Sequence, residues 1–132
     1  MESGFQFKNP SLTKLEFIVN NDFSSEGKKS VQIQVNMSVD ITRDQNLNEA
    51  TVALKVEIGD KGDVGPYYIN VVEEARFRWG EEFSDEQVEK LLNQNAPSLL
   101  LSYVRPIVAQ TTASSLYGTY NIPFMNFTQK KK

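Results

Sequence analysis

The 132-residue chain contains no cysteine and no histidine. These absences exclude disulfide bonds, thiolate and imidazole metal sites, cysteine nucleophiles and every catalytic triad that uses histidine as its base. An enzyme of this sequence would have to work with Asp, Glu, Lys, Arg, Tyr, Ser or Thr, for example with a carboxylate pair such as Glu73 with Glu74 or Glu81 with Glu82. Adjacent strand residues point to opposite faces, so neither pair can share a site. We therefore expect a protein that is not an enzyme and that uses no metal and no cofactor.

Long apolar runs are also missing. No stretch approaches the roughly 18 uncharged apolar residues of a membrane span, and the first residues, MESGFQFKNPSL, lack the basic start and apolar run of a secretory signal. We expect a cytoplasmic protein that does not insert into the membrane. The length predicts one domain over residues 1–132, with its core at about 12–127 and a flexible basic tail at 128–132.

Charge is scarce in the last third of the chain. All 17 acidic residues lie within residues 1–90, whereas Arg105 is the single charged residue between positions 91 and 129. An acidic body argues against a nucleic-acid partner, because such binders present a basic stripe. A long, weakly polar, uncharged segment is typical of a subunit interface or of an adhesive surface.

Alternating apolar and polar residues predict four strands, at residues 12–20, 31–41, 50–58 and 67–79. In the fourth strand, Glu73 is the one polar residue on the apolar face. The Gly- and Asp-rich stretch at residues 59–66 predicts a turn between the third and fourth strands, rather than a phosphate or calcium site.

Two helices are predicted after the strands. Ser84 and Gln87 form a capping-box pattern that opens a helix to about Asn95, and Pro97 starts a second helix. Pro106 predicts a kink or a break in that second helix. Its apolar stripe consists of Leu100, Tyr103, Val104, Ile107, Val108 and Thr111. The order of elements predicts an α+β fold, with a consecutively connected four-stranded antiparallel sheet and two C-terminal helices packed on one face.

We expect the aromatic residues of the last predicted strand to lie against the uncharged segment. Each of them, taken alone, is readily explained as a core residue. Together they give more weakly polar surface than one small sheet-and-helix layer can bury. We therefore predict a binding or assembly face, and place unfolded-peptide binding at Phe77, Trp79, Leu100, Tyr103 and Val104.

The uncharged segment also resembles a known family. Residues 96–107, APSLLLSYVRPI, continue without a gap to PFMNF at 123–127, and this stretch is similar to the SecB export chaperones. The residues that carry the resemblance are Pro97, Leu100, Tyr103, Arg105, Ile107, Asn126 and Phe127, with support from Phe77 and Trp79 and from the stretch Phe5, Gln6 and Phe7. The resemblance implies a homotetramer, assembled as a dimer of dimers, that holds unfolded preproteins in apolar grooves for translocation.

Departures from the family pattern leave the client and partners open. Ser102 and Pro106 stand where the family usually has Pro and Glu, and no acidic extension follows Phe127. That extension assists handoff to the SecA translocation motor, so SecA remains one candidate partner among others. We expect an ATP-independent chaperone for unfolded preproteins. The alternatives are a SecB-like chaperone dedicated to an antitoxin or another client, a non-chaperone oligomeric interaction protein of the same fold, and a carboxylate enzyme.

Overall fold

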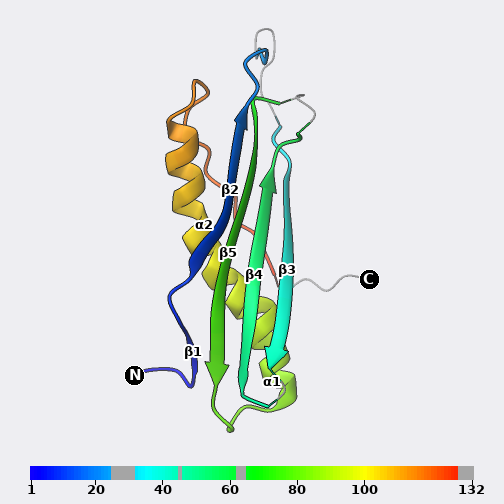
Figure 1. Cartoon of the computed structure of the whole chain (residues 1–132), viewed down its shortest axis with the longest axis vertical. Helices are drawn as coiled ribbons and strands as arrows, with labels where there is room; N and C mark the ends of the chain where they lie inside the picture. The colour runs from blue at the N-terminus through cyan, green and yellow to red at the C-terminus, as the bar shows by residue number, and fades with distance from the viewer. Residues whose placement is uncertain (25–31, 45, 62–64, 128–132) are drawn as a thin grey trace.

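The computed structural model describes residues 1–24, 32–44, 46–61 and 65–127 (Figure 1). The predicted basic tail at 128–132, the predicted strand start at Val31 and the middle of the predicted 59–66 turn lie outside these residues. The elements in chain order are β1 (Phe5–Phe7), β2 (Ser11–Val19), β3 (Val35–Asp44), β4 (Glu49–Ile58), β5 (Tyr67–Trp79), α1 (Asp85–Lys90), the π-helical segment Leu91–Asn95 and α2 (Ala96–Ala113). The predicted α+β class is confirmed, with five strands instead of four.

The sheet has the order β1-β5-β4-β3, and β2 also pairs with β5, next to β1. All of these pairings are antiparallel. The expected consecutive connection is therefore wrong for the first long strand, because β2 pairs with β5 across the sheet from β3. The 13-residue β5 is buried on both faces over residues 67–71, as suits a central strand, while the charged Lys14 and Glu16 of β2 suit an edge.

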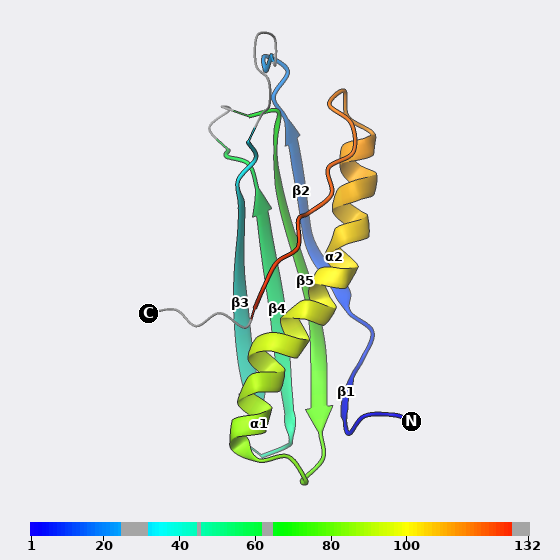
Figure 2. The ribbon, with the colours of Figure 1, turned by 180° about the vertical axis from the view of Figure 1, so that it is seen from behind.

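The two faces of the sheet differ sharply. Residues that are paired across antiparallel strands point to the same side, so every second residue of β3, β4 and β5 forms one apolar face. α2 and the C-terminal segment lie across that face (Figure 2). Five residues of β4 are completely buried there: Ala50, Val52, Leu54, Val56 and Ile58. The opposite, outer face carries the polar residues of the same strands, and none of the helices in the described part of the chain covers it (Figure 1).

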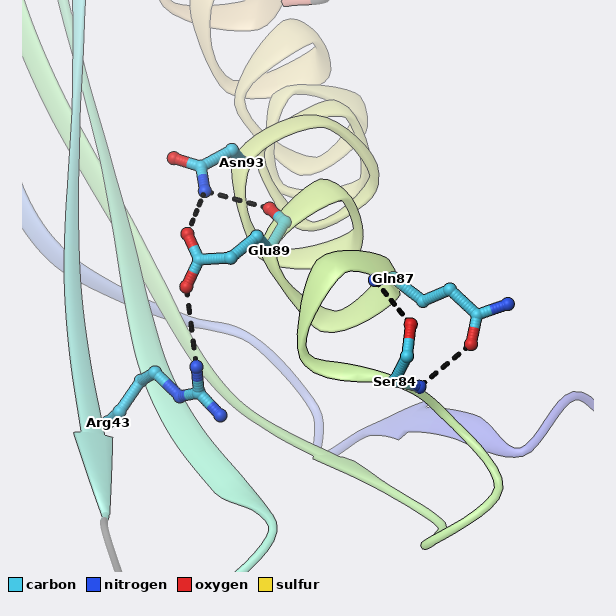
Figure 3. Close-up of polar contacts among 5 residues, drawn as sticks. All are labelled: Arg43, Ser84, Gln87, Glu89 and Asn93. Carbon is cyan, nitrogen blue, oxygen red and sulfur yellow. Dashed lines mark hydrogen bonds and ion pairs between the residues drawn. The ribbon is translucent and has the colours of Figure 1, made fainter.

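The capping box at the start of α1 is confirmed. The Ser84 hydroxyl accepts a hydrogen bond from the Gln87 main-chain nitrogen at 3.2 Å, and the Ser84 main-chain nitrogen donates to Gln87 Oε1 at 2.8 Å (Figure 3). α1 is also tied to the edge strand β3, because Arg43 forms an ion pair with Glu89 at 3.3 Å. Asn93 donates to the Glu89 main-chain oxygen at 2.7 Å and steadies this turn.

The helices are joined rather than separated at Pro97. Leu91–Asn95 form a π-helical turn in which the Ala96 main-chain nitrogen donates to the Leu91 carbonyl, five residues back. Proline in a helix lacks its own donor and clashes with the carbonyl four residues earlier, here that of Asn93. The wider π turn changes this spacing, so one helical rod runs from α1 into α2. The expected start of a second helix at Pro97 is confirmed to within one residue, since α2 begins at Ala96, but α2 continues the preceding helical turns without a gap.

α2 also continues through Pro106 to Ala113, so of the two outcomes expected at this proline, a kink or a break, the break is wrong (Figure 2). Pro106 is exposed and lies on the side of the helix that faces away from the sheet. The carbonyl of Ser102, which loses its usual helical donor, belongs to an exposed residue that water can reach. None of the helices in the described ranges is long and apolar enough to span a membrane.

Candidate functional site

The five residues predicted to bind peptide come together where β5 meets α2, but four of them are core residues. Phe77, Leu100 and Val104 are at most 1% exposed, and Trp79 is 7% exposed. Tyr103, at 38% exposed, is the one predicted site residue that reaches the surface. The other four therefore pack within the core beneath that surface.

The short strand β1 explains why the two aromatic residues of β5 are covered. Phe5 stacks on Phe77 and Trp79, with ring centroids 5.5 and 6.5 Å apart. The Arg43 guanidinium lies 5.3 Å from the centroid of the Trp79 ring, a cation–π distance. A strand of three residues therefore converts what the sequence indicated as a binding face into part of the core.

Exposed apolar side chains lie instead along the β1 and β2 edge. Phe7, Leu12 and Leu15 are paired with Phe77, Glu73 and Val71, so they point to the side of the sheet that carries α2. Each of these three is between 38% and 46% exposed. A register shift between Leu12 and Lys14 places leucines that are three residues apart on the same side of the strand.

One flank of α2 continues this apolar set. At about 100° of rotation per residue, Tyr103 and Arg105 lie on opposite flanks of the buried face centred on Val104. Arg105 faces the C-terminal segment, to which it is hydrogen-bonded, so the Tyr103 flank faces the β2 side (Figure 2). We use the name α2–β2 apolar surface for the partly or largely exposed apolar side chains on the two elements that flank this side of β5: Phe7, Leu12, Leu15, Leu99, Tyr103 and Ile107.

The sequence reasoning missed most of this surface because it scored helix and strand positions by apolarity alone. The spacing of Leu12 and Leu15, which breaks the alternation of β2, was the available signal. An apolar residue out of phase on a strand that also carries Lys14 and Glu16 indicates an edge with an unsatisfied apolar side.

Glu73 is the polar residue that was predicted on the apolar face, and it is only 3% exposed. It lies between Leu12 of β2 and Leu54 of β4 in the register of the sheet. Within the described ranges it forms no hydrogen bond or ion pair, and burial raises the pKa of its carboxyl. No cluster of three or more acidic residues in the same ranges is arranged to hold a metal ion.

The outer face carries a network of mixed charge. Tyr68 donates from its hydroxyl to Glu57 Oε2 at 2.7 Å, and this bond lowers the pKa of Glu57. The same bond, with burial, raises the pKa of Tyr68 to about 12. Lys61 lies 3.5 Å from Glu16, and Lys55 lies 3.7 Å from Glu57. Each of these charged groups therefore has a partner within the chain.

The C-terminal strap, residues 116–127, belongs to no strand or helix and runs from the end of α2 across the apolar face of the sheet toward β3 (Figure 2). Ile122 is buried in the core, and Tyr117, Tyr120, Met125 and Phe127 pack against it. Arg105 donates to the main-chain oxygens of Ile122 and of Pro123, the latter at 3.0 Å.

Comparison with known families shows which family the chain belongs to. The model of the family described as "Preprotein translocase subunit SecB" matches residues 13–130. The chain belongs to the SecB family. Membership confirms the resemblance in the uncharged segment and places the protein among non-enzymatic chaperones.

Two solved structures share this SecB-family fold. The SecB-like chaperone Rv1957 of Mycobacterium tuberculosis, solved in complex with a ChAD peptide from the HigA1 antitoxin, is 12% identical, with a TM-score of 0.71 over 92% of this chain and 91% of that one. A Streptococcus agalactiae protein of unknown function is 14% identical, with a TM-score of 0.52 over 94% of this chain and all of the other. No curated protein matches the sequence.

Proposed function

We propose that this SecB-family protein is an ATP-independent holdase that binds unfolded polypeptides. The observation that carries the proposal is the α2–β2 apolar surface, which lies beside a strand with an open edge. Among the described residues, β2 pairs with β5 alone, so its second edge offers main-chain donors and acceptors. An extended chain can pair with such an edge while its apolar side chains contact Leu12, Leu15 and Tyr103.

An unfolded client suits this surface better than a folded one. Folded proteins bury most of their apolar residues and pair most of their main-chain groups, whereas an unfolded chain presents both. Several weak contacts of this kind, repeated over the subunits of an assembly, give high overall avidity with fast local exchange. We therefore propose a homotetramer, in which several such surfaces act on one client.

The relatives indicate which clients to compare. The family description names a preprotein translocase subunit, and the Mycobacterium structure contains an antitoxin peptide. A preprotein and an antitoxin segment are therefore the first two clients for this protein, with SecA as the partner to test beside the preprotein.

The test is suppression of aggregation. A chemically unfolded client is diluted into buffer with and without the protein, in the absence of nucleotide, and light scattering is followed. We expect scattering to be delayed in proportion to the amount of protein, and we expect no binding to the same client once folded. Unchanged scattering at a molar excess of folded protein would overturn the proposal.

The α2–β2 apolar surface also favours a second candidate, an oligomeric interaction protein in which the same residues serve only as a subunit interface. Tyr103→Glu separates the two functions. If the surface binds clients, the variant loses client affinity. If the surface is only a subunit interface, the variant loses its assembly state, and neither the variant nor the wild type binds an unfolded client.

A further inference from the structure

The edge of the sheet that β1 and β2 share is interrupted between the two strands. β1 is paired with β5 as far as Phe77, and β2 takes up the pairing at Glu74. Between these points, residues 8–10 lie opposite residues 75–76 of β5, so the edge has one extra residue there. An extra residue bends the strand that carries it and turns its side chains in a new direction (Figure 1).

A cleft of about 140 Å³ lies at this interruption, where β1, β5 and β4 meet. It is lined by Phe7, Lys8, Glu49, Arg76, Phe77 and Arg78. The charged residues alternate with Phe7 and Phe77 along their strands, so they belong to the outer face of the sheet. Three of the six lining residues are cations, although residues 1–90 contain all 17 acidic residues of the chain. The cleft is therefore a positive site on an acidic part of the protein.

Arg76 already has partners within the chain. Its Nε donates to Glu49 Oε1 at 2.5 Å, and a second guanidinium nitrogen lies 3.6 Å from Asp44 Oδ2. The Thr51 hydroxyl accepts a third contact from the same guanidinium, at 3.5 Å. All three contacts lie toward β4 and β3. They hold Arg76 on that side of the cleft, and they occupy Glu49, the one carboxylate that lines it.

Lys8 and Arg78 are the two cations that the cleft leaves without a partner. Both are exposed, and within the ranges that the structure describes neither side chain forms an ion pair or a hydrogen bond. Arg78 is paired with Gln6, and the Lys8 main-chain nitrogen donates to the Arg76 carbonyl at 3.0 Å. Lys8 and Arg78 are therefore diagonal neighbours on one face, a relationship that places residues about 7–8 Å apart.

That spacing matches an extended acidic peptide. A strand rises about 3.3 Å per residue, so two carboxylates separated by one residue lie on the same side of an extended chain, roughly 7 Å apart. Each can pair with one of the two cations. The apolar atoms of Phe7 and Phe77 in the lining exclude water from one side, which strengthens such charge pairs.

We infer that the cleft docks an extended, acidic segment of a partner protein, with two carboxylates paired to Lys8 and Arg78. A nucleic acid suits the cleft less well, because Asp44, Glu49 and Glu74 surround it and repel a continuous line of phosphates. A peptide can confine its charge to the two side chains that meet the cations. The inference is separate from the holdase function, since it depends on charge pairing on the outer face, although Phe7 belongs to both sites.

The test uses charge reversal and a peptide that lacks apolar side chains. The probe is a short fluorescein-labelled peptide of alternating glutamate and serine, which offers nothing to the α2–β2 apolar surface. A sister peptide has glutamine in place of every glutamate. Binding is followed by anisotropy with wild type, Lys8→Glu and Arg78→Glu. Lys14→Glu is the matched control, because it makes the same charge change at an exposed position of the same face, outside the cleft.

We expect the glutamate peptide to bind the wild type and the control variant, and to bind each cleft variant at least about tenfold more weakly, since reversal replaces attraction with repulsion. We expect no binding of the glutamine peptide, and weaker binding of the glutamate peptide at high salt. Circular dichroism checks that the variants fold. Absence of binding to the wild type, equal affinity for the cleft variants, or equal binding of the two peptides would overturn the inference.

Two further measurements identify other occupants. Displacement of the peptide by an equal concentration of inorganic phosphate would show that the cleft binds small anions, and this would overturn the peptide assignment. Light scattering without peptide tests a second copy of the chain, whose acidic residues 81–86 carry the right charge. A particle mass that falls in both cleft variants, but not in Lys14→Glu, would assign the cleft to that copy and overturn the proposed partner. Unfolded-client binding that is unchanged in the cleft variants would show that the two functions are independent, as the inference requires.

Discussion

Tyr103 and Val104 are neighbours on α2 that face opposite environments, since Tyr103 is 38% exposed and Val104 is completely buried against the sheet. Substitutions at these two neighbouring residues therefore distinguish an effect on client binding from an effect on folding. Val104→Glu places an unpaired charge in the core, at a cost of several kcal/mol, which approaches the total stability of about 5–15 kcal/mol for a domain. We expect it to unfold the protein, as followed by circular dichroism and urea denaturation.

Tyr103→Glu, in contrast, leaves the core intact. We expect normal circular dichroism and a loss of client affinity of at least about tenfold, equivalent to about 1.4 kcal/mol. Titration of an unfolded polypeptide against both variants and wild type measures the effect. A folded Tyr103→Glu variant with wild-type affinity would show that the α2–β2 apolar surface does not contact the client.

Glu73 predicts an unusual pH dependence of stability. Because burial raises its pKa in the folded state, folding disfavours the charged form, and this unfavourable contribution grows as pH rises above the ordinary value of 4.5. Glu73→Gln is therefore expected to stabilise the protein at pH 7.5 by on the order of 1 kcal/mol, the scale on which unpaired buried polar groups act. The gain should shrink toward pH 4.5.

Glu74→Gln is the matched control, because the neighbouring side chain is exposed on the outer face. Urea unfolding of both variants at the two pH values isolates the buried group. A Glu73→Gln variant that is less stable than wild type at pH 7.5 would mean that the carboxylate has a favourable partner in the folded protein.

The Tyr68–Glu57 hydrogen bond on the outer face predicts a pH dependence of stability that is opposite in sign to that of Glu73. The pKa of Glu57 is lowered in the folded state, so the bond contributes stability above the ordinary value of 4.5 and loses it as pH falls below that value. Tyr68→Phe is expected to cost about 1 kcal/mol at pH 7, since Glu57 is partly exposed and water weakens the bond. The cost should diminish at pH 3 in chemical denaturation. A cost that does not depend on pH would assign it to loss of the Tyr68 hydroxyl itself and not to its bond with the ionised Glu57 carboxylate.

Assembly is expected to be tetrameric. Outside the α2–β2 apolar surface, Ile18, Leu47 and Leu116 are also exposed, and this apolar area is more than a monomer normally presents to water. Size exclusion with multi-angle light scattering at micromolar concentration measures the mass directly. A mass of one chain, 15.0 kDa, would remove the avidity on which the holdase mechanism depends.

The sequence predicted those features that local pattern determines. The alternation of β4 and β5, buried Glu73 and the Ser84 capping box are all encoded within a few residues, and the structure confirms each of them. The pairing of β2 with β5 could not be read in this way, because it joins residues far apart in the chain. Strand β1 was too short to show a period, and the π turn before Pro97 has no simple pattern.

The site was harder to predict than the fold for a physical reason. Trp79 and Tyr103 are both aromatic residues on apolar faces, and apolarity alone does not say which face another element covers. Phe5 and Arg43 cover Trp79, and both approach it from distant parts of the chain. Only the three-dimensional arrangement shows that Trp79 lies in the core and that Tyr103 reaches the surface.

The most direct test of the holdase function is the dissociation constant for one client in two states. A polypeptide kept permanently unfolded by chemical modification is titrated, without nucleotide, into the wild-type protein, and the folded parent of the same polypeptide is titrated in parallel. We expect saturable binding of the unfolded form and at least about tenfold weaker binding of the folded form. Equal binding of the two forms, or no binding of the unfolded form by a correctly folded protein, would contradict it.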